Sequence, residues 1–131
     1  RFPNEHRYAS WLGLPPNNKK TGGNVFSTKT RHRPSPTGTA LRLAAQSLLS
    51  SKSVLGDRFR RLRARLGAPK AITAMAHLLA KLIYRGLTRG QVYLEAGLAA
   101  LQDQSRSNTL LALHRRAHRL GFELTPLQKT A

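Results

Sequence analysis

The sequence predicts an all-α fold, a small helical bundle of about five helices with a long basic loop rich in Gly, Ser and Thr. Apolar residues recur at helical spacing in several segments, and Asn, Ser, Pro and Gly stand where those segments should begin and end. No stretch of the sequence alternates apolar and polar residues as a half-buried strand would. With 131 residues, 40% of them hydrophobic and 6% aromatic, the chain can bury one small, mainly aliphatic core.

The first predicted helix covers residues 5–12, where apolar side chains share one face. Asn4 can cap its start and Gly13 can end it, so residues 1–16 are expected to form an N-terminal helix and turn. Residues 17–38 are rich in Gly, Pro, Ser, Thr and Lys, and we expect a flexible basic loop without regular structure. A loop of this length in a compact domain is usually functional or disordered.

The helical core of the same domain is expected in residues 39–131. Its central helix, residues 71–87, is apolar nearly all round and should lie in the middle of the bundle. Gly121 is expected to stop the last helix. Because of Gly86, Gly90 and Gly97, residues 88–102 are expected to be a weaker connection with a short helical piece at Leu98 to Leu101. The predicted core helices are residues 39–50, the segment between a capping Ser53 and a stopping Gly67, residues 71–87 and residues 105–120.

The charge of the chain is strongly positive, because 23 Lys or Arg face only 5 Asp or Glu and give a formal net charge of +18. Residues 1–70 carry +13 of this charge and residues 71–131 carry +5. Such a charge repels itself in the compact state unless a polyanion neutralises it, so we expect nucleic acid as the partner, ahead of an acidic membrane surface or an acidic protein. Arg, which grips phosphate in bidentate fashion, predominates over Lys.

The composition also excludes several kinds of site. The chain has no cysteine, which excludes a disulfide scaffold, a Cys-based zinc site and a thiol nucleophile, and which permits a cytosolic compartment. Two-metal nucleases and polynucleotidyl transferases need clustered carboxylates, whereas the acids of this chain lie in separate segments. We therefore expect no cofactor and no metal ligand set in this chain. The acids are Glu5, Asp57, Glu95, Asp103 and Glu123.

The histidines do not predict a metal site. His114 and His118 lie four positions apart, as two zinc ligands on one helix would. However, Arg115 stands where the general-base Glu of such a motif is found, so we interpret both as solvated or phosphate-facing side chains. His77, in the apolar helix, is interpreted as a core residue with satisfied hydrogen bonds.

Two basic features remain as candidate contacts with nucleic acid, although each could also be a solvated surface. One is a run of arginines balanced only by Asp57, in which Arg58, Arg61 and Arg65 are the predicted phosphate contacts. The other is the loop of residues 17–38, where cations surround hydroxyl groups and could stabilise the charge that develops when a hydroxyl attacks a phosphodiester. The predicted contacts of the loop are Lys19, Lys20, Lys29, Arg31 and Arg33, and its candidate nucleophiles are Thr21 and Ser27.

Most of the chain lines up with one known family. The first matching segments are Arg-Phe-Pro-Asn-Glu at 1–5, Tyr-Ala-Ser-Trp-Leu-Gly-Leu at 8–14, Pro-Asn-Asn at 16–18, Thr-Gly-Gly at 21–23, Ser27, Thr-Arg at 30–31 and Thr-Ala-Leu-Arg at 39–42. The later ones are Arg-Leu-Arg-Ala-Arg-Leu-Gly-Ala-Pro-Lys-Ala-Ile-Thr-Ala at 61–74, Ala-His at 76–77 and Gly-Phe-Glu-Leu at 121–124. Together they resemble the C-terminal transposase domain of the insertion-sequence 110/116/902 type, found in bacterial mobile-element recombinases related to the Piv DNA invertases.

The resemblance implies a split enzyme for DNA transposition. Members of that family carry an N-terminal RuvC-like domain with acidic metal ligands and a helical C-terminal domain that contributes a serine nucleophile, and some use a guide RNA. The chain resembles the second domain only, so a truncated copy is expected, and a divalent metal such as Mg²⁺ is expected only together with the acidic domain. The implied partners are DNA, a guide RNA, the RuvC-like domain and, at full length, further copies of the chain, without a membrane. The implied location is the bacterial cytoplasm, at the nucleoid.

The position that matches the family's serine is Thr21, which precedes Gly22 and Gly23. A threonine hydroxyl can attack a phosphodiester, but its methyl group crowds an in-line approach. Three interpretations stay open: Thr21 is the nucleophile, Ser27 is the nucleophile, or the copy is decayed and inactive as an isolated fragment. The alternative function is a small basic RNA-binding or nucleoid-associated protein without catalysis.

Overall fold

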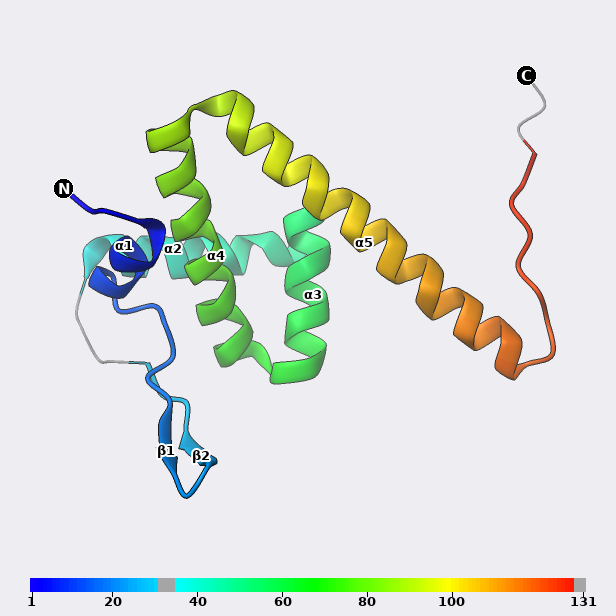
Figure 1. Cartoon of the computed structure of the whole chain (residues 1–131), viewed down its shortest axis with the longest axis horizontal. Coiled ribbons are helices and arrows are strands. Elements are labelled where there is room, and N and C mark those ends of the chain that lie inside the picture. The colour runs from blue at the N-terminus through cyan, green and yellow to red at the C-terminus, as the bar shows by residue number, and fades with distance from the viewer. Residues whose placement is uncertain (31–34, 129–131) are drawn as a thin grey trace.

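The structure, a computed structural model that describes residues 1–30 and 35–128, confirms the predicted all-α bundle (Figure 1). The one sheet of the described residues is a two-stranded hairpin. The helices are α1 (Glu5–Trp11), α2 (Pro36–Ser47), α3 (Val54–Leu66), α4 (Ala68–Arg89) and α5 (Gln91–Arg119), with a 3₁₀ turn η1 (Leu48–Ser50) after α2, and the strands are β1 (Lys19–Thr21) and β2 (Asn24–Ser27).

Helix α4 is the centre of the bundle, as its apolar sequence predicts, and α1, α2 and α3 pack against it. Its buried residues include the large Met75 and the small Ala71 and Ala76, and the two alanines allow the neighbouring helices to approach closely. Burying one large side chain such as Phe59 of α3 contributes about 1.5–3 kcal/mol. The core is small and mainly aliphatic. Its other residues are Ala9, Leu12, Leu14, Leu41, Ala45 and Ala80.

Helix α1 is docked on α4 by polar and aromatic contacts. The Asn4 side chain caps α1 as predicted, because its Oδ1 accepts a hydrogen bond of 2.9 Å from the backbone N–H of Arg7. The Tyr84 hydroxyl of α4 donates a hydrogen bond of 2.7 Å to the carbonyl oxygen of Phe2. The Phe2 ring lies 5.4 Å from the ring of Trp11, measured between centroids. These contacts hold the start of the chain against the central helix.

The prediction that residues 17–38 lack regular structure is wrong, because this segment contains the β1–β2 hairpin. Gly22 and Gly23 form its two-residue turn with φ of 56° and 83°, and a type I′ turn needs positive φ at both positions. Figure 1 shows the hairpin protruding from the bundle. Residues 31–34 lie outside the described residues. Helix α2 begins at Pro36 rather than at Thr39, because the Ser35 side chain caps it.

The prediction of a weak connection at residues 88–102 is also wrong. Helix α4 ends at Arg89, a single residue, Gly90, turns the corner, and α5 then runs without a break to Arg119. Gly90 has φ 85° and ψ 172°, a backbone conformation that is essentially restricted to glycine. Gly67 makes the corner between α3 and α4 in nearly the same conformation, with φ 83° and ψ 165°.

The end of α5 agrees with the prediction. Gly121 has φ 81°, and its backbone N–H donates a hydrogen bond of 3.1 Å to the carbonyl oxygen of His118. The backbone N–H of Phe122 donates one of 2.9 Å to the carbonyl oxygen of Ala117, which completes a Schellman motif. Within the described part of the chain, no residue of α5 is buried, and Figure 1 shows its last turns extending beyond the bundle.

Candidate nucleic-acid interface

Three of the predicted phosphate contacts, Arg58, Arg61 and Arg65, line one groove. It lies between α3 and α5 and has a volume of about 310 Å³. The three side chains belong to exposed residues and follow one another at positions i, i+3 and i+7, which places them on one face of α3. We call this feature the α3–α5 groove. Its other lining residues are Val54, Leu62, Leu101, Gln104, Ser105 and Asn108.

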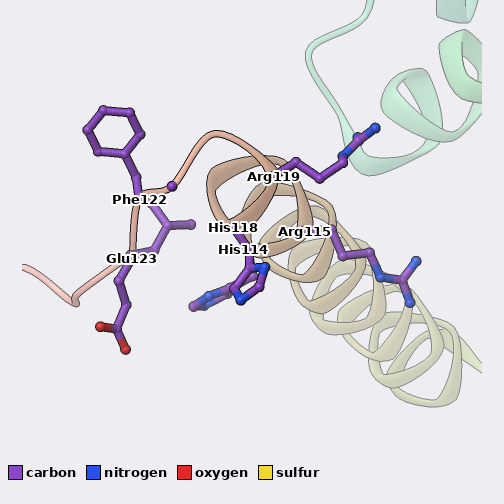
Figure 2. Close-up of a pocket in the computed structure, with 8 residues that line it drawn as sticks. His114, Arg115, His118, Arg119, Phe122 and Glu123 are labelled. Carbon is purple, nitrogen blue, oxygen red and sulfur yellow. The ribbon is translucent and has the colours of Figure 1, made fainter.

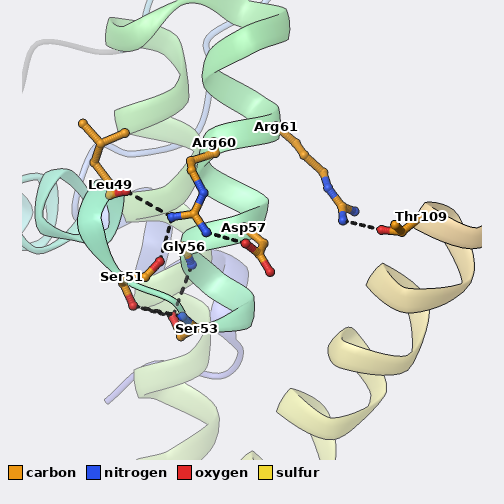
Figure 3. Close-up of polar contacts among 8 residues, drawn as sticks. All are labelled: Leu49, Ser51, Ser53, Gly56, Asp57, Arg60, Arg61 and Thr109. Atoms are coloured by element: carbon orange, nitrogen blue, oxygen red, sulfur yellow. Dashed lines mark hydrogen bonds and ion pairs between the residues drawn. The ribbon is translucent and has the colours of Figure 1, made fainter. Parts of the chain in front are cut away.

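The groove is basic without compensation, because none of its lining residues in the described chain is an Asp or Glu. The α5 wall instead offers amide and hydroxyl groups, which can bond to phosphate oxygens as donors. Figure 3 shows Arg61 pointing from α3 toward α5, where its Nη2 donates a hydrogen bond of 2.8 Å to the Oγ1 of Thr109, the residue after the lining Asn108. This bond links the two walls.

Arg60 belongs to the same run of arginines but has a structural role. Its Nη1 donates hydrogen bonds of 3.1 Å to the carbonyl oxygen of Leu49 and 2.7 Å to that of Ser51, and its Nη2 is paired with Asp57 (Figure 3). Arg60 therefore ties α3 to η1 and faces away from the groove. Of the five arginines of the run, Arg60 is structural, three line the groove, and Arg63 is an exposed residue outside the lining.

The start of α3 is fixed by two further features at the same corner. The Ser53 Oγ accepts a hydrogen bond of 3.3 Å from the backbone N–H of Gly56, which confirms the predicted cap. A Cβ atom at Gly56 would lie 2.2 Å from the carbonyl oxygen of Ser51, so only glycine fits there. This close backbone approach sets the direction in which α3 presents its arginines.

The predicted basic loop contacts lie in and beside the hairpin. Lys19 and Lys20 are exposed residues of β1, and Lys29 is an exposed residue just after β2. The other two predicted loop contacts, Arg31 and Arg33, lie outside the described residues. Phe26 of β2 is 67% exposed, so the hairpin also presents an aromatic ring among these cations.

The two candidate nucleophiles lie at opposite ends of the hairpin ladder. Thr21 is exposed beside the turn, where it pairs with Asn24. Ser27 is half-buried, pairs with Lys19, and its Oγ accepts a long hydrogen bond of 3.5 Å from the backbone N–H of Lys29. Thr21 is therefore the hydroxyl presented at the protruding tip, and Ser27 lies nearer the bundle.

The described acids do not form a metal site. No group of three or more His, Cys, Asp or Glu in residues 1–30 and 35–128 could hold a metal ion. Glu5 is paired with Arg85, Asp57 is paired with Arg60, and the Glu95 carboxylate accepts a hydrogen bond of 2.8 Å from Gln91. Carboxylates that are separated and engaged in this way do not fit a two-metal site.

A second, wider groove lies at the end of α5 and has a volume of about 1160 Å³. Figure 2 shows His114 and His118 projecting from one side of the helix toward the segment of Glu123, with Arg115 and Arg119 pointing away. All four are exposed residues, in agreement with the interpretation of solvated or phosphate-facing histidines.

A third cavity, which the sequence did not indicate, lies between the base of the hairpin and the start of α4. We call it the hairpin cleft; its volume is about 830 Å³. It forms because the backbone N–H of Asn17 donates a hydrogen bond of 3.1 Å to the carbonyl oxygen of Lys29, which closes the base of the hairpin. The lining residues are Leu14, Pro16, Asn18, Thr28, Lys29, Thr30, Leu66, Pro69, Lys70, Thr73, Ala74 and His77.

His77 differs from the expectation of a satisfied core residue. It is half-buried and lines the hairpin cleft, and its Nε2 is buried without a hydrogen-bond partner among the described residues. Burial lowers the pKa of His77 below its ordinary value of 6.5, and Lys81 and His6 lower it further by repulsion, whereas Glu5 raises it. The folded structure therefore favours the neutral imidazole.

Comparison of the chain with protein-family models, with curated proteins and with solved structures gives no match. Among the described residues, no helix combines the length and the apolar character needed to cross a membrane.

Proposed function

We propose that the chain is the DNA-binding C-terminal domain of a transposase that acts in DNA transposition. The observation that carries the proposal is the α3–α5 groove, which three exposed arginines line and no described carboxylate neutralises. Arginine forks suit phosphate in bidentate geometry, and a groove of this charge matches a nucleic-acid backbone. The family resemblance of the sequence supports DNA as the nucleic acid.

The hairpin supplies the second part of the proposal. It protrudes from the bundle, carries Lys19 and Lys20, and presents the Thr21 hydroxyl at its tip (Figure 1). A hydroxyl so exposed can enter a composite site in which another domain supplies the carboxylates and the metal. In this proposal the Thr21 oxygen attacks a DNA phosphodiester, forms a new O–P bond and displaces a deoxyribose hydroxyl as the old ester bond breaks, while the Thr21 proton passes to a base of the other domain. The neighbouring lysines stabilise the developing negative charge, and the isolated chain is inactive.

A salt titration of DNA binding tests the first part. Binding of the chain to a fully paired duplex is measured by fluorescence anisotropy at several salt concentrations, and the slope of log K against log[salt] is compared between variants. Replacing Arg58, Arg61 and Arg65 together by Gln should make the slope shallower by about 2.7, since each phosphate contact contributes about 0.9.

The matched control removes three positive charges elsewhere. Arg7, Lys52 and Arg116 are exposed residues of α1, the segment before α3, and α5, and none of them lines the α3–α5 groove. Their triple replacement by Gln gives the same net charge and should change the slope by less than half as much. Equal changes in the two triple variants would mean that net charge alone drives binding, and they would remove the groove from the interface.

A further inference from the structure

The hairpin cleft has the dimensions of a small-molecule site. Its volume of about 830 Å³ falls within the range of about 300–1,000 Å³ that is typical of such sites. Leu14, Pro16, Leu66 and Pro69 give it an apolar surface against which a flat ring can pack. Its two walls come from the base of the hairpin and from the α3–α4 corner, so it is formed by segments distant in sequence.

The charge of the cleft favours an anion. Lys29 lines it from the hairpin side and Lys70 from the helix side, and none of the described lining residues is an Asp or Glu. Both lysines are exposed residues, so their ammonium groups can adjust to a ligand. A phosphate at the mouth of the cleft is the simplest group that both could neutralise.

The polar groups of the helix wall favour a ligand with both hydrogen-bond donors and acceptors. His77 lines the cleft, and its Nε2, which is closed to solvent in this conformation, has no hydrogen-bond partner in the described chain, so its capacity for one bond is unused. The Thr73 hydroxyl donates a hydrogen bond of 3.1 Å to the carbonyl oxygen of Pro69, which leaves its oxygen free to accept. A nucleobase edge carries donors and acceptors side by side.

We infer that the hairpin cleft binds one unpaired nucleotide of a nucleic acid. The phosphate lies toward Lys29 and Lys70, the base packs on the apolar wall, and its edge faces His77. Arg65 of the α3–α5 groove and Leu66 of the cleft are consecutive residues at the end of α3, so the cleft begins where the row of arginines ends. The inference rests on the proposed function in one respect, namely that the nucleotide belongs to a bound nucleic acid and is not free in solution.

Titration of the full chain with small probes tests the cleft itself. Deoxyadenosine 5′-phosphate, deoxyadenosine and inorganic phosphate are each added while ¹H–¹⁵N NMR spectra are recorded. The nucleotide should give saturable shifts at Thr30, Thr73 and His77 and should bind at least about tenfold more tightly than either part alone. Absence of saturable shifts at these residues would overturn the inference.

Variants of the cleft, each with a control variant, test whether the nucleotide binds in this cleft. Ala74→Phe fills it and should weaken nucleotide binding about tenfold, whereas Ala99→Phe, on the exposed surface of α5, should leave binding unchanged. If Ala74→Phe perturbs folding, Lys70→Gln gives the same test at an exposed position, with Lys52→Gln as its control. Binding that is unaffected in the cleft variants would place the nucleotide elsewhere and contradict the inference.

A duplex with one unpaired nucleotide separates nucleic acid from free nucleotide. The chain should bind this duplex about tenfold more tightly than a fully paired one at the same salt concentration, and Ala74→Phe should remove the difference. Equal binding of both duplexes, with deoxyadenosine 5′-phosphate still bound, would assign the cleft to free nucleotides and overturn the inference. The Arg58, Arg61 and Arg65 triple variant should retain nucleotide binding, so failure of the proposed function remains distinguishable.

Discussion

Arg85 of α4 donates hydrogen bonds to both carboxylate oxygens of Glu5, 80 positions earlier in the chain. The Glu5 side chain is only 17% exposed, so the pair lies partly out of water, in the interface between α1 and α4. The hydrogen bonds from Arg85 lower the pKa of Glu5, and those to Glu5 raise the pKa of Arg85. One carboxylate therefore fixes the first helix on the central one.

A double-mutant cycle measures this pair. Glu5→Gln, Arg85→Gln and the double variant should show a coupling of about 1–2 kcal/mol in the free energy of unfolding, between the values of exposed and of buried ion pairs. The measurement is urea denaturation followed by Trp11 fluorescence, since the Trp11 ring packs on Phe2, whose carbonyl oxygen accepts a hydrogen bond from Tyr84 of α4. A coupling indistinguishable from zero would show that the two charges are solvated independently.

Stability should fall with acidification in two separate pH ranges. Because the folded state lowers the pKa of His77, the unfolded chain binds this proton more readily, and stability is lost as the pH falls from 6.5 toward the lowered value. Glu5 contributes stability above its ordinary pKa of 4.5, and this is lost as the pH falls further, through its lowered value. Urea denaturation across pH 3–8 measures both steps; His77→Gln should abolish only the upper one and Glu5→Gln only the lower one.

Replacing a glycine by alanine should lower the stability of the protein at a helix corner and raise it inside a helix. Gly67→Ala forces a Cβ into a glycine-only conformation and should destabilise the protein by about 1–3 kcal/mol. Gly97 lies inside α5, and a Cβ atom there would contact nothing within 4 Å, so Gly97→Ala should stabilise α5 by about 0.5–1 kcal/mol. Urea denaturation followed by circular dichroism compares them, and loss of stability in both would contradict the assignment of Gly97 to a regular helix.

Replacing Arg60 should change the stability of the fold, whereas replacing the groove arginines should change DNA binding. Arg60→Gln removes bonds to two carbonyl oxygens and to Asp57, and should lower the free energy of unfolding by about 1–3 kcal/mol. Its salt slope of DNA binding should stay close to that of the unmodified chain at temperatures where it is folded. A slope that becomes shallower by about 0.9, the contribution of one phosphate contact, would show that Arg60 contacts DNA.

The proposed nucleophile is tested by supplying the acidic domain of a transposase from the family that the sequence resembles, together with Mg²⁺ and DNA. The mixture should form a covalent protein–DNA adduct, seen as a shifted band on a denaturing gel, because the Thr21 hydroxyl is exposed at the hairpin tip. Thr21→Ala should abolish the adduct and Thr21→Ser should strengthen it. An adduct that survives Thr21→Ala and disappears with Ser27→Ala would assign the role to Ser27. If the full-length family member reacts and Thr21→Ser does not, the domain is decayed.

The helices of the bundle were predictable because their signals are local. Asn4, Ser53 and Gly121 act as the caps and the stop that the sequence indicates, and the apolar residues of α4 form the core. Gly97 misled the prediction, since an isolated glycine lowers helix propensity but a long helix tolerates it. The hairpin was missed although Gly22-Gly23 is a two-residue turn signal, because its strands are short and do not alternate apolar and polar residues.

Only the part of the candidate site that lies on a single helix face could be predicted from the sequence. Arg58, Arg61 and Arg65 share a face of α3 by spacing alone, but their α5 wall depends on the corner at Gly90 and cannot be read from local sequence. The division between Arg60 and its neighbours depends on carbonyl oxygens of η1 and the segment after it. The hairpin cleft depends on packing between residues 14–30 and 66–77, and no periodicity encodes such a contact.

Helix α5 has a consequence for the cooperativity of unfolding. Its outer turns extend beyond the bundle, and none of its residues in the described chain is buried, so they can lose helical structure without opening the core (Figure 1). Circular dichroism, which reports all helices, should therefore begin to decrease on heating before Trp11 fluorescence, which reports the packing of α1 against Phe2. The two melting curves then have different midpoints, and a single Tm does not describe this molecule.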